Sequence, residues 1–105
     1  MKSLPLVAPA GCTLSADGLA AQVARAEVLR RAVLGVERAA GGLRVAFAPD
    51  VDRGALATLV ATERECCSFL AIDYGEDARL LELRSDDARG PEVLATLAAA
   101  FEGPA

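Results

Sequence analysis

The spacing of apolar and polar residues along the chain predicts three helices and four strands. Apolar residues that recur every three or four positions indicate the buried stripe of a helix, and strict alternation indicates a half-buried strand. The predicted order is a helix that follows Ser15 and runs to about Arg31, two strands within 32–48, a helix over 52–67, two strands near 70–75 and 79–84, and a helix over 91–101. Each pair of strands therefore follows one helix and precedes another.

The first helix and the first pair of strands have recognisable end signals. Ser15 is a residue type that caps helix N-termini, and Asp17 places an acidic group in the first turn. The segment 32–48 divides at Ala-Gly-Gly into two apolar, β-prone runs, which is typical of a hairpin. In the second run every other position is a large apolar residue, namely Leu43, Val45 and Phe47.

The second half of the chain repeats this alternation of helix and hairpin. Pro49 ends the preceding strand, and the helix over 52–67 carries an apolar stripe that continues past its end. That stripe consists of Leu56, Leu59, Val60, Glu63, Cys67 and Leu70. Leu81 and Leu83 alternate with charged residues in the last strand, and Pro91 occupies the favoured first position of the last helix.

This order of elements predicts an α+β domain. The expected architecture is a four-stranded, mostly antiparallel sheet with helices packed on one face, in the order αββαββα. An additional edge strand over residues 4–8 or 11–14 would give a ferredoxin-like core with an extra N-terminal strand. At 105 residues the chain is expected to form a single domain over 1–105, with an ordered core over 11–102.

Composition and charge narrow the class of protein. The chain is 53% hydrophobic and 25% charged, as expected for a globular domain rather than a disordered one. Its net charge of −4 and its scattered basic residues argue against nucleic-acid or anionic-membrane partners. No apolar run approaches the roughly 20 residues that span a bilayer. Pro5 and Pro9 interrupt the short apolar stretch before Cys12, which resembles a lipoprotein signal only superficially. We therefore expect a cytoplasmic protein.

Cysteine is the residue type that carries candidate chemistry. The chain has three cysteines, Cys12, Cys66 and Cys67, and no histidine. An odd count excludes a complete set of internal disulfides and fits reduced thiols in the cytosol. Glu63 lies three and four positions before the cysteine pair, so the three side chains are expected near one face of the helix. Neighbouring side chains diverge on a regular helix, so both thiols can face one ion only if the helix ends or kinks there.

This setting favours metal binding over thiol catalysis. A reactive thiolate is favoured at a helix N-terminus or near a cation, whereas the cysteine pair is predicted near a helix C-terminus beside Glu63 and Glu65. Without histidine no Cys–His dyad can form. A metal ion brings its own positive charge and deprotonates its thiol ligands. Three thiolates and one carboxylate suit Hg(II), As(III), Cd(II) or Cu(I), or Zn(II) if Glu63 or water completes a tetrahedral set.

The combined pattern resembles a family of small actinobacterial domains. The matching residues, spread over 11–102, are Cys12-Thr13-Leu14, Gly41-Gly42, Glu63, Cys66-Cys67 and Phe69. Members of that family stand alone or are fused behind MerR-type DNA-binding domains that respond to heavy metals. The resemblance implies a heavy-metal context, with a MerR-type regulator or a second copy of the chain as a candidate partner. Members often have proline after the cysteine pair, where this chain has Ser68.

We therefore predict that Cys12, Glu63, Cys66 and Cys67 bind a soft metal or metalloid ion in a sensing or resistance context, without catalysis. Two alternatives stay open. Organomercurial lyases use two cysteines and a carboxylate to cleave carbon–mercury bonds, and Glu63 would then act as the proton donor. In the other alternative the cysteines only pack, since cysteine is among the most buried residue types, and the domain is an interaction module.

Overall fold

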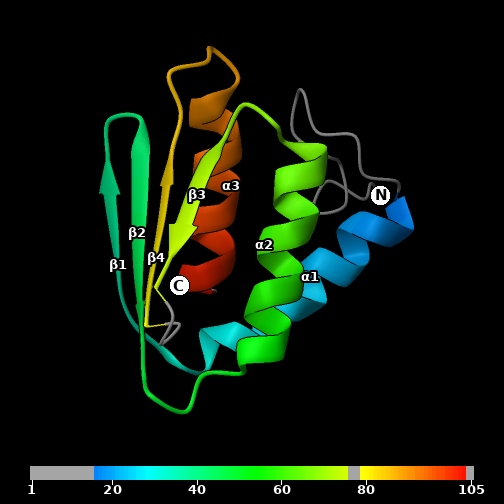
Figure 1. Cartoon of the computed structure of the whole chain (residues 1–105), viewed down its shortest axis with the longest axis vertical. Helices are drawn as coiled ribbons and strands as arrows, with labels where there is room; N and C mark the ends of the chain where they lie inside the picture. Colours follow the sequence, from blue (N-terminus) through cyan, green and yellow to red (C-terminus); the bar gives the residue numbers. More distant parts are fainter. Residues whose placement is uncertain (1–15, 76–78, 104–105) are drawn as a thin grey trace.

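The computed structural model describes residues 16–75 and 79–103, and within them it contains three helices and one four-stranded sheet (Figure 1). The elements are α1 (Ala16–Arg30), β1 (Val33–Ala39), β2 (Gly42–Phe47), α2 (Arg53–Cys66), β3 (Ala71–Tyr74), β4 (Leu80–Arg84) and α3 (Gly90–Glu102). The predicted α+β class and the order αββαββα are confirmed. The Ser15 cap, the additional strand over 4–8 or 11–14, and the centre of the turn between β3 and β4 lie outside the described residues.

The sheet has the strand order β1-β2-β4-β3, and every neighbouring pair is antiparallel. It follows that β2 and β3 run parallel to each other with β4 between them, and α2 connects them. This is the split β-α-β arrangement of ferredoxin-like folds. In that fold the last strand follows the last helix, whereas here the edge strand β1 precedes β2 and joins it by a hairpin. The split arrangement brings the end of α2 next to the start of β3.

The hairpin between β1 and β2 turns at Gly41, which has a φ of 68°. Side chains with a Cβ are strained in this left-handed region, and glycine is not. A Cβ at Gly41 would also lie 3.2 Å from the carbonyl oxygen of Ser85. The backbone approaches closely because the Ser85 N–H donates to the Gly41 carbonyl over 3.0 Å.

The core lies between the sheet and the helices, all of which are on one side of the sheet (Figure 1). Helix α3 packs on β1 and β2, α2 contacts β3, and α1 packs against both α2 and α3. The inward-facing strand residues are Leu43, Val45, Phe47, Ile72, Leu81 and Leu83. Phe47 meets Phe101 of α3 edge to face, with ring centroids 6.0 Å apart and an interplanar angle of 76°. The period-two alternation predicted for β2 and β4 is confirmed.

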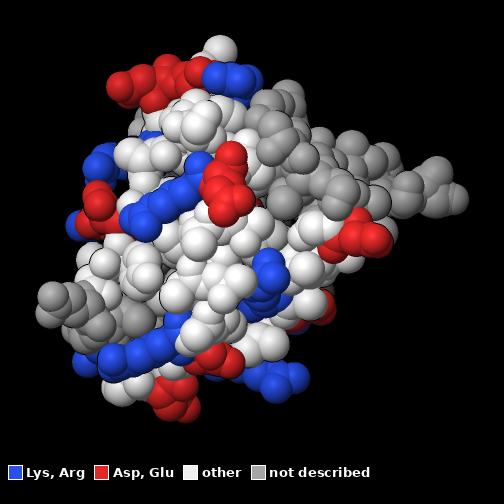
Figure 2. All heavy atoms as spheres, turned by 45° about the vertical axis from the view of Figure 1, so that its right-hand side comes forward, with Lys and Arg blue, Asp and Glu red and all other residues white. Residues whose placement is uncertain are grey.

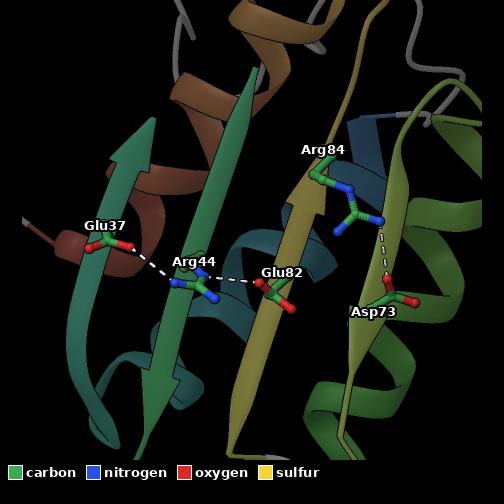
Figure 3. Close-up of polar contacts among 5 residues, drawn as sticks. All are labelled: Glu37, Arg44, Asp73, Glu82 and Arg84. Atoms are coloured by element: carbon green, nitrogen blue, oxygen red, sulfur yellow. Dashed lines mark hydrogen bonds and ion pairs between the residues drawn. The ribbon is translucent and has the colours of Figure 1, made fainter. Parts of the chain in front are cut away.

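The opposite face of the sheet carries charged side chains that pair across the strands (Figure 3). Arg44 on β2 donates to Glu82 on β4 over 2.9 Å and lies 3.6 Å from Glu37 on β1. Arg84 on β4 contacts Asp73 on β3 at 3.3 Å. Exposed pairs of this kind are each worth little, roughly 0–1 kcal/mol, but they match opposite charges in neighbouring strands.

The face of the molecule in Figure 2 mixes acidic, basic and uncharged side chains, without a broad field of one sign. Within 16–75 and 79–103, none of the helices combines the length and the apolar character that a membrane span requires.

Candidate metal site

Helix α2 positions the candidate ligands at its C-terminal end. Asp52 caps the helix, because its side chain accepts a hydrogen bond of 2.9 Å from the Ala55 N–H. The buried residues that follow recur every three or four positions and are Leu56, Leu59, Val60, Glu63 and Cys66. Glu63 therefore extends an otherwise apolar stripe into the core, and Cys66 lies one turn further along.

The helix ends between the two cysteines. Cys66 is its last residue, and Cys67 leaves the helical conformation with φ −124° and ψ 67°. The Cys67 N–H still donates to the Glu63 carbonyl over 2.8 Å, and the Leu70 N–H donates to the Cys67 carbonyl over 3.0 Å. This change of backbone direction brings the two sulfur atoms to 3.3 Å from each other. The sequence analysis required the helix to end or kink at the cysteine pair if both thiols were to face one ion. The helix does end there.

Contacts on both sides of the pair hold this helix end in place. The guanidinium of Arg64 donates to the Ile72 carbonyl of β3 over 2.7 Å. Downstream, Phe69 packs partly into the core, and the guanidinium carbon of Arg89 lies 4.4 Å from its ring centroid. A cation over an aromatic face is attracted to it electrostatically.

Arg89 is itself oriented by Asp87, in the loop that leads into α3. Its side chain donates two hydrogen bonds of 2.8 Å to the Asp87 carboxylate, and its backbone N–H donates a third. The side-chain hydrogen bonds from Arg89, followed by its backbone hydrogen bond, hold the pKa of the Asp87 carboxyl well below its usual value of 3.8. An ionised Asp87 thus keeps Arg89 over Phe69 across the neutral pH range.

The donor atoms of Glu63, Cys66 and Cys67 all lie within 4.8 Å of one another. All three residues are buried, with exposed fractions of 5%, 6% and 0%. Neither cysteine forms a disulfide. Of the four predicted ligands, the structure thus brings three together, while Cys12 lies outside the described residues. The arrangement offers two soft sulfur donors and one hard oxygen donor around a common point.

Two residues of α1 complete the site, and the sequence analysis did not identify them. The side-chain amide of Gln22 donates to Glu63 Oε2 over 2.8 Å and to the Leu59 carbonyl over 3.1 Å. Gln22 Oε1 in turn accepts a hydrogen bond of 2.7 Å from Arg25. Arginine can only donate, so this contact requires the amide oxygen to face Arg25 and the NH₂ group to face Glu63. The buried Glu63 Oε2 is therefore held as an acceptor.

Gln22 is a polar residue on the buried face of α1. That face runs through Gln22, Ala26 and Leu29, while Val28 is 44% exposed. A buried polar residue at this position gives no signal in a hydrophobic pattern. The available indication was the spacing of four positions from Gln22 to Ala26 and of three from Ala26 to Leu29.

Comparisons with protein-family models, with curated proteins and with solved structures found no match for this chain. The resemblance to the actinobacterial heavy-metal family therefore stays a prediction from sequence.

Proposed function

We propose that this domain binds a soft metal or metalloid ion through Cys66 and Cys67, with Glu63 as the accompanying oxygen donor. The supporting observation is the convergence of these three buried donor atoms within 4.8 Å of one another at the end of α2. The context in which the ion is bound is sensing or resistance, as the sequence resemblance implies. Cys12 is a further candidate ligand of the same kind.

The chemistry of the donors selects the class of ion. Calcium takes six to eight oxygen ligands and magnesium requires octahedral oxygen coordination, whereas this cluster provides one carboxylate. Thiolates favour soft ions such as Hg(II), As(III), Cd(II) and Cu(I), and also Zn(II). The hydrogen bond from Gln22 fixes the Glu63 carboxyl group in position, much as outer hydrogen bonds orient metal-ligating carboxylates.

The organomercurial-lyase alternative uses the same three residues but requires Glu63 to donate a proton. Glu63 Oε2 accepts from Gln22, which leaves Oε1 as the only oxygen to carry that proton. Release of hydrocarbon from an organomercurial by the reduced protein would establish the lyase instead.

The proposal is tested by native mass spectrometry and calorimetry on protein that has been reduced and then desalted. We expect one Hg(II) or As(III) per folded chain, and no uptake of Mg(II) or Ca(II) at the same concentrations. The control is a variant in which all three cysteines are replaced by serine. If the wild-type chain takes up no more soft ion than this variant, the cysteines are packing residues and the domain is an interaction module.

A further inference from the structure

The distance between the two thiols defines an angle at any atom bound to both of them. With metal–sulfur bonds of about 2.3 Å, the length found for zinc, sulfur atoms 3.3 Å apart subtend an angle of about 92°. This angle depends only on the bond length and on the separation of the two sulfurs. It is the angle that corresponds to the sulfur separation in this structure, where the two thiols are in hydrogen-bonding contact.

Soft ions differ in the angle that they require. Linear two-coordinate binding, which Hg(II) prefers with thiolates, requires the sulfurs to be about 4.6 Å apart at the same bond length. A tetrahedral ion such as Zn(II) or Cd(II) requires about 3.8 Å. Trivalent arsenic carries a lone pair and forms a three-bonded pyramid with angles somewhat above 90°. The pair in this structure is therefore closest to the pyramidal geometry and furthest from the linear one.

The surroundings of the pair oppose a change in the sulfur–sulfur distance. Cys67 is fully buried and Cys66 is 6% exposed, so a change of either rotamer has to be accommodated by the neighbouring core residues. The backbone that carries them is held upstream by the Arg64 contact to Ile72. It is held downstream by the Leu70–Cys67 turn. Opening the sulfurs by more than 1 Å would require repacking of this corner of the core.

We propose that the natural ligand class of this site is neutral trivalent arsenic, as arsenous acid, As(OH)₃. This inference rests on the proposed function and specifies its ion. Two hydroxyl groups on arsenic are replaced by the two thiols: two As–O bonds and two S–H bonds break, two As–S bonds form, and two water molecules leave with the thiol protons. Arsenic stays trivalent, and no oxidant or reductant takes part.

Glu63 is a candidate partner for the third coordination position of arsenic. Its ligating oxygen lies within 4.8 Å of both sulfurs, so it is the candidate partner for the remaining hydroxyl of the bound arsenic. That hydroxyl can donate a hydrogen bond to the carboxylate. Both the incoming molecule and the two-thiol adduct are uncharged, which suits a site whose ligands are all buried.

Thermal unfolding of the reduced chain distinguishes an ion with pyramidal coordination from one with linear coordination. A ligand stabilises a protein only to the extent that it binds the folded chain better than the unfolded chain. Arsenite at about 100 times its dissociation constant is expected to raise the midpoint temperature of unfolding by about 5–15 °C. Hg(II) at saturation is expected to leave it unchanged or lower it, because the unfolded chain can open its thiols to the linear geometry. Cys66→Ser and Cys67→Ser should each abolish the arsenite shift.

The outcomes distinguish the arsenic assignment from the broader proposal of soft-ion binding. If Hg(II) raises the midpoint as much as arsenite does, or if arsenite is bound without any shift, the arsenic assignment is overturned and soft-ion binding stands. If neither ion is taken up, both are overturned. X-ray absorption at the arsenic edge of the wild-type complex does not depend on the folding of the serine variants. It should show at least two sulfur neighbours, and one or none would overturn the assignment.

Discussion

Gln22 of α1 and Glu63 of α2 are 41 positions apart in sequence, and their buried side chains share a hydrogen bond of 2.8 Å. The bond joins the first helix to the candidate metal site. Because Arg25 fixes which way the amide faces, the NH₂ group of Gln22 holds the Glu63 carboxyl group. A substitution in α1 should therefore affect the site at the thiol pair.

Replacing Gln22 by leucine should lower the free energy of unfolding by about 1–3 kcal/mol, because Glu63 is left buried without the Gln22 donor. Urea unfolding of the reduced protein measures this effect. The matched control is the double variant Gln22→Leu, Glu63→Leu, in which both partners are apolar. It should be more stable than the sum of the two single changes predicts. Strict additivity would mean that the hydrogen bond does not couple the helices.

Glu63→Ala should weaken soft-ion binding markedly, whereas Glu65→Ala should leave it nearly unchanged. Glu63 is 5% exposed and its oxygen lies within 4.8 Å of both sulfurs, while Glu65 is exposed on the other side of the same helix turn. Titration calorimetry with arsenite and with Cd(II) on both variants makes the comparison. Equal affinities for the two variants would remove Glu63 from the site.

In a Cys12→Ser background, the two remaining thiols should react slowly with a disulfide reagent in the native state and quickly in urea. Their burial, 6% and 0% exposed, is the reason. A bound soft ion should slow the native reaction further. Absorbance of the released thiolate follows the rate. Fast reaction of both thiols in native protein, at the speed of the unfolded chain, would contradict the buried site.

Stability should also depend on pH through the pair formed by Arg38 on β1 and Glu102 at the end of α3. Arg38 donates two hydrogen bonds to the Glu102 carboxylate, and these side-chain bonds lower the pKa of Glu102 below its ordinary value of 4.5. A lowered folded-state pKa gives stability that is complete above the unfolded-state value and is lost as the pH falls below it.

The difference in stability between wild type and Glu102→Gln should therefore be present at pH 6–7 and shrink as the pH falls below about 4.5. Urea unfolding at each pH provides the values. In an Arg38→Gln background the Glu102 change should lose most of this pH dependence. A difference that is constant with pH would show that the pair does not contribute to stability.

Gly41→Ala should destabilise the fold by about 1–2 kcal/mol, the cost of the left-handed conformation for a residue with a Cβ. Its φ is 68°, and the added Cβ would lie 3.2 Å from the Ser85 carbonyl oxygen. Gly42→Ala is the control, since its φ is not positive and its new Cβ would meet the Leu83 carbonyl oxygen at 3.6 Å. The two variants should differ clearly in their thermal midpoints, and equal midpoints would contradict the turn geometry.

The sequence by itself determined the elements and the local part of the site. Helices and strands have different periods, so the alternation of Leu43, Val45 and Phe47 predicted β2, and the three- and four-residue spacing predicted α2. The proximity of Glu63 to the cysteine pair follows from the same local geometry, because residues three and four apart share a helix face. Its burial was predicted by its place in an apolar stripe, and the structure confirms it.

Only the tertiary structure decided which groups meet across the chain. Gln22 is polar and lies in a helix whose apolar stripe is indistinct, so no local rule pairs it with Glu63. The closeness of the two sulfurs depends on the backbone of Cys67, which leaves the helix where Arg64 and Phe69 anchor the start of β3. Such contacts arise from how α1, α2 and the sheet pack, and packing depends on the shapes of many side chains together rather than on the period of any one segment.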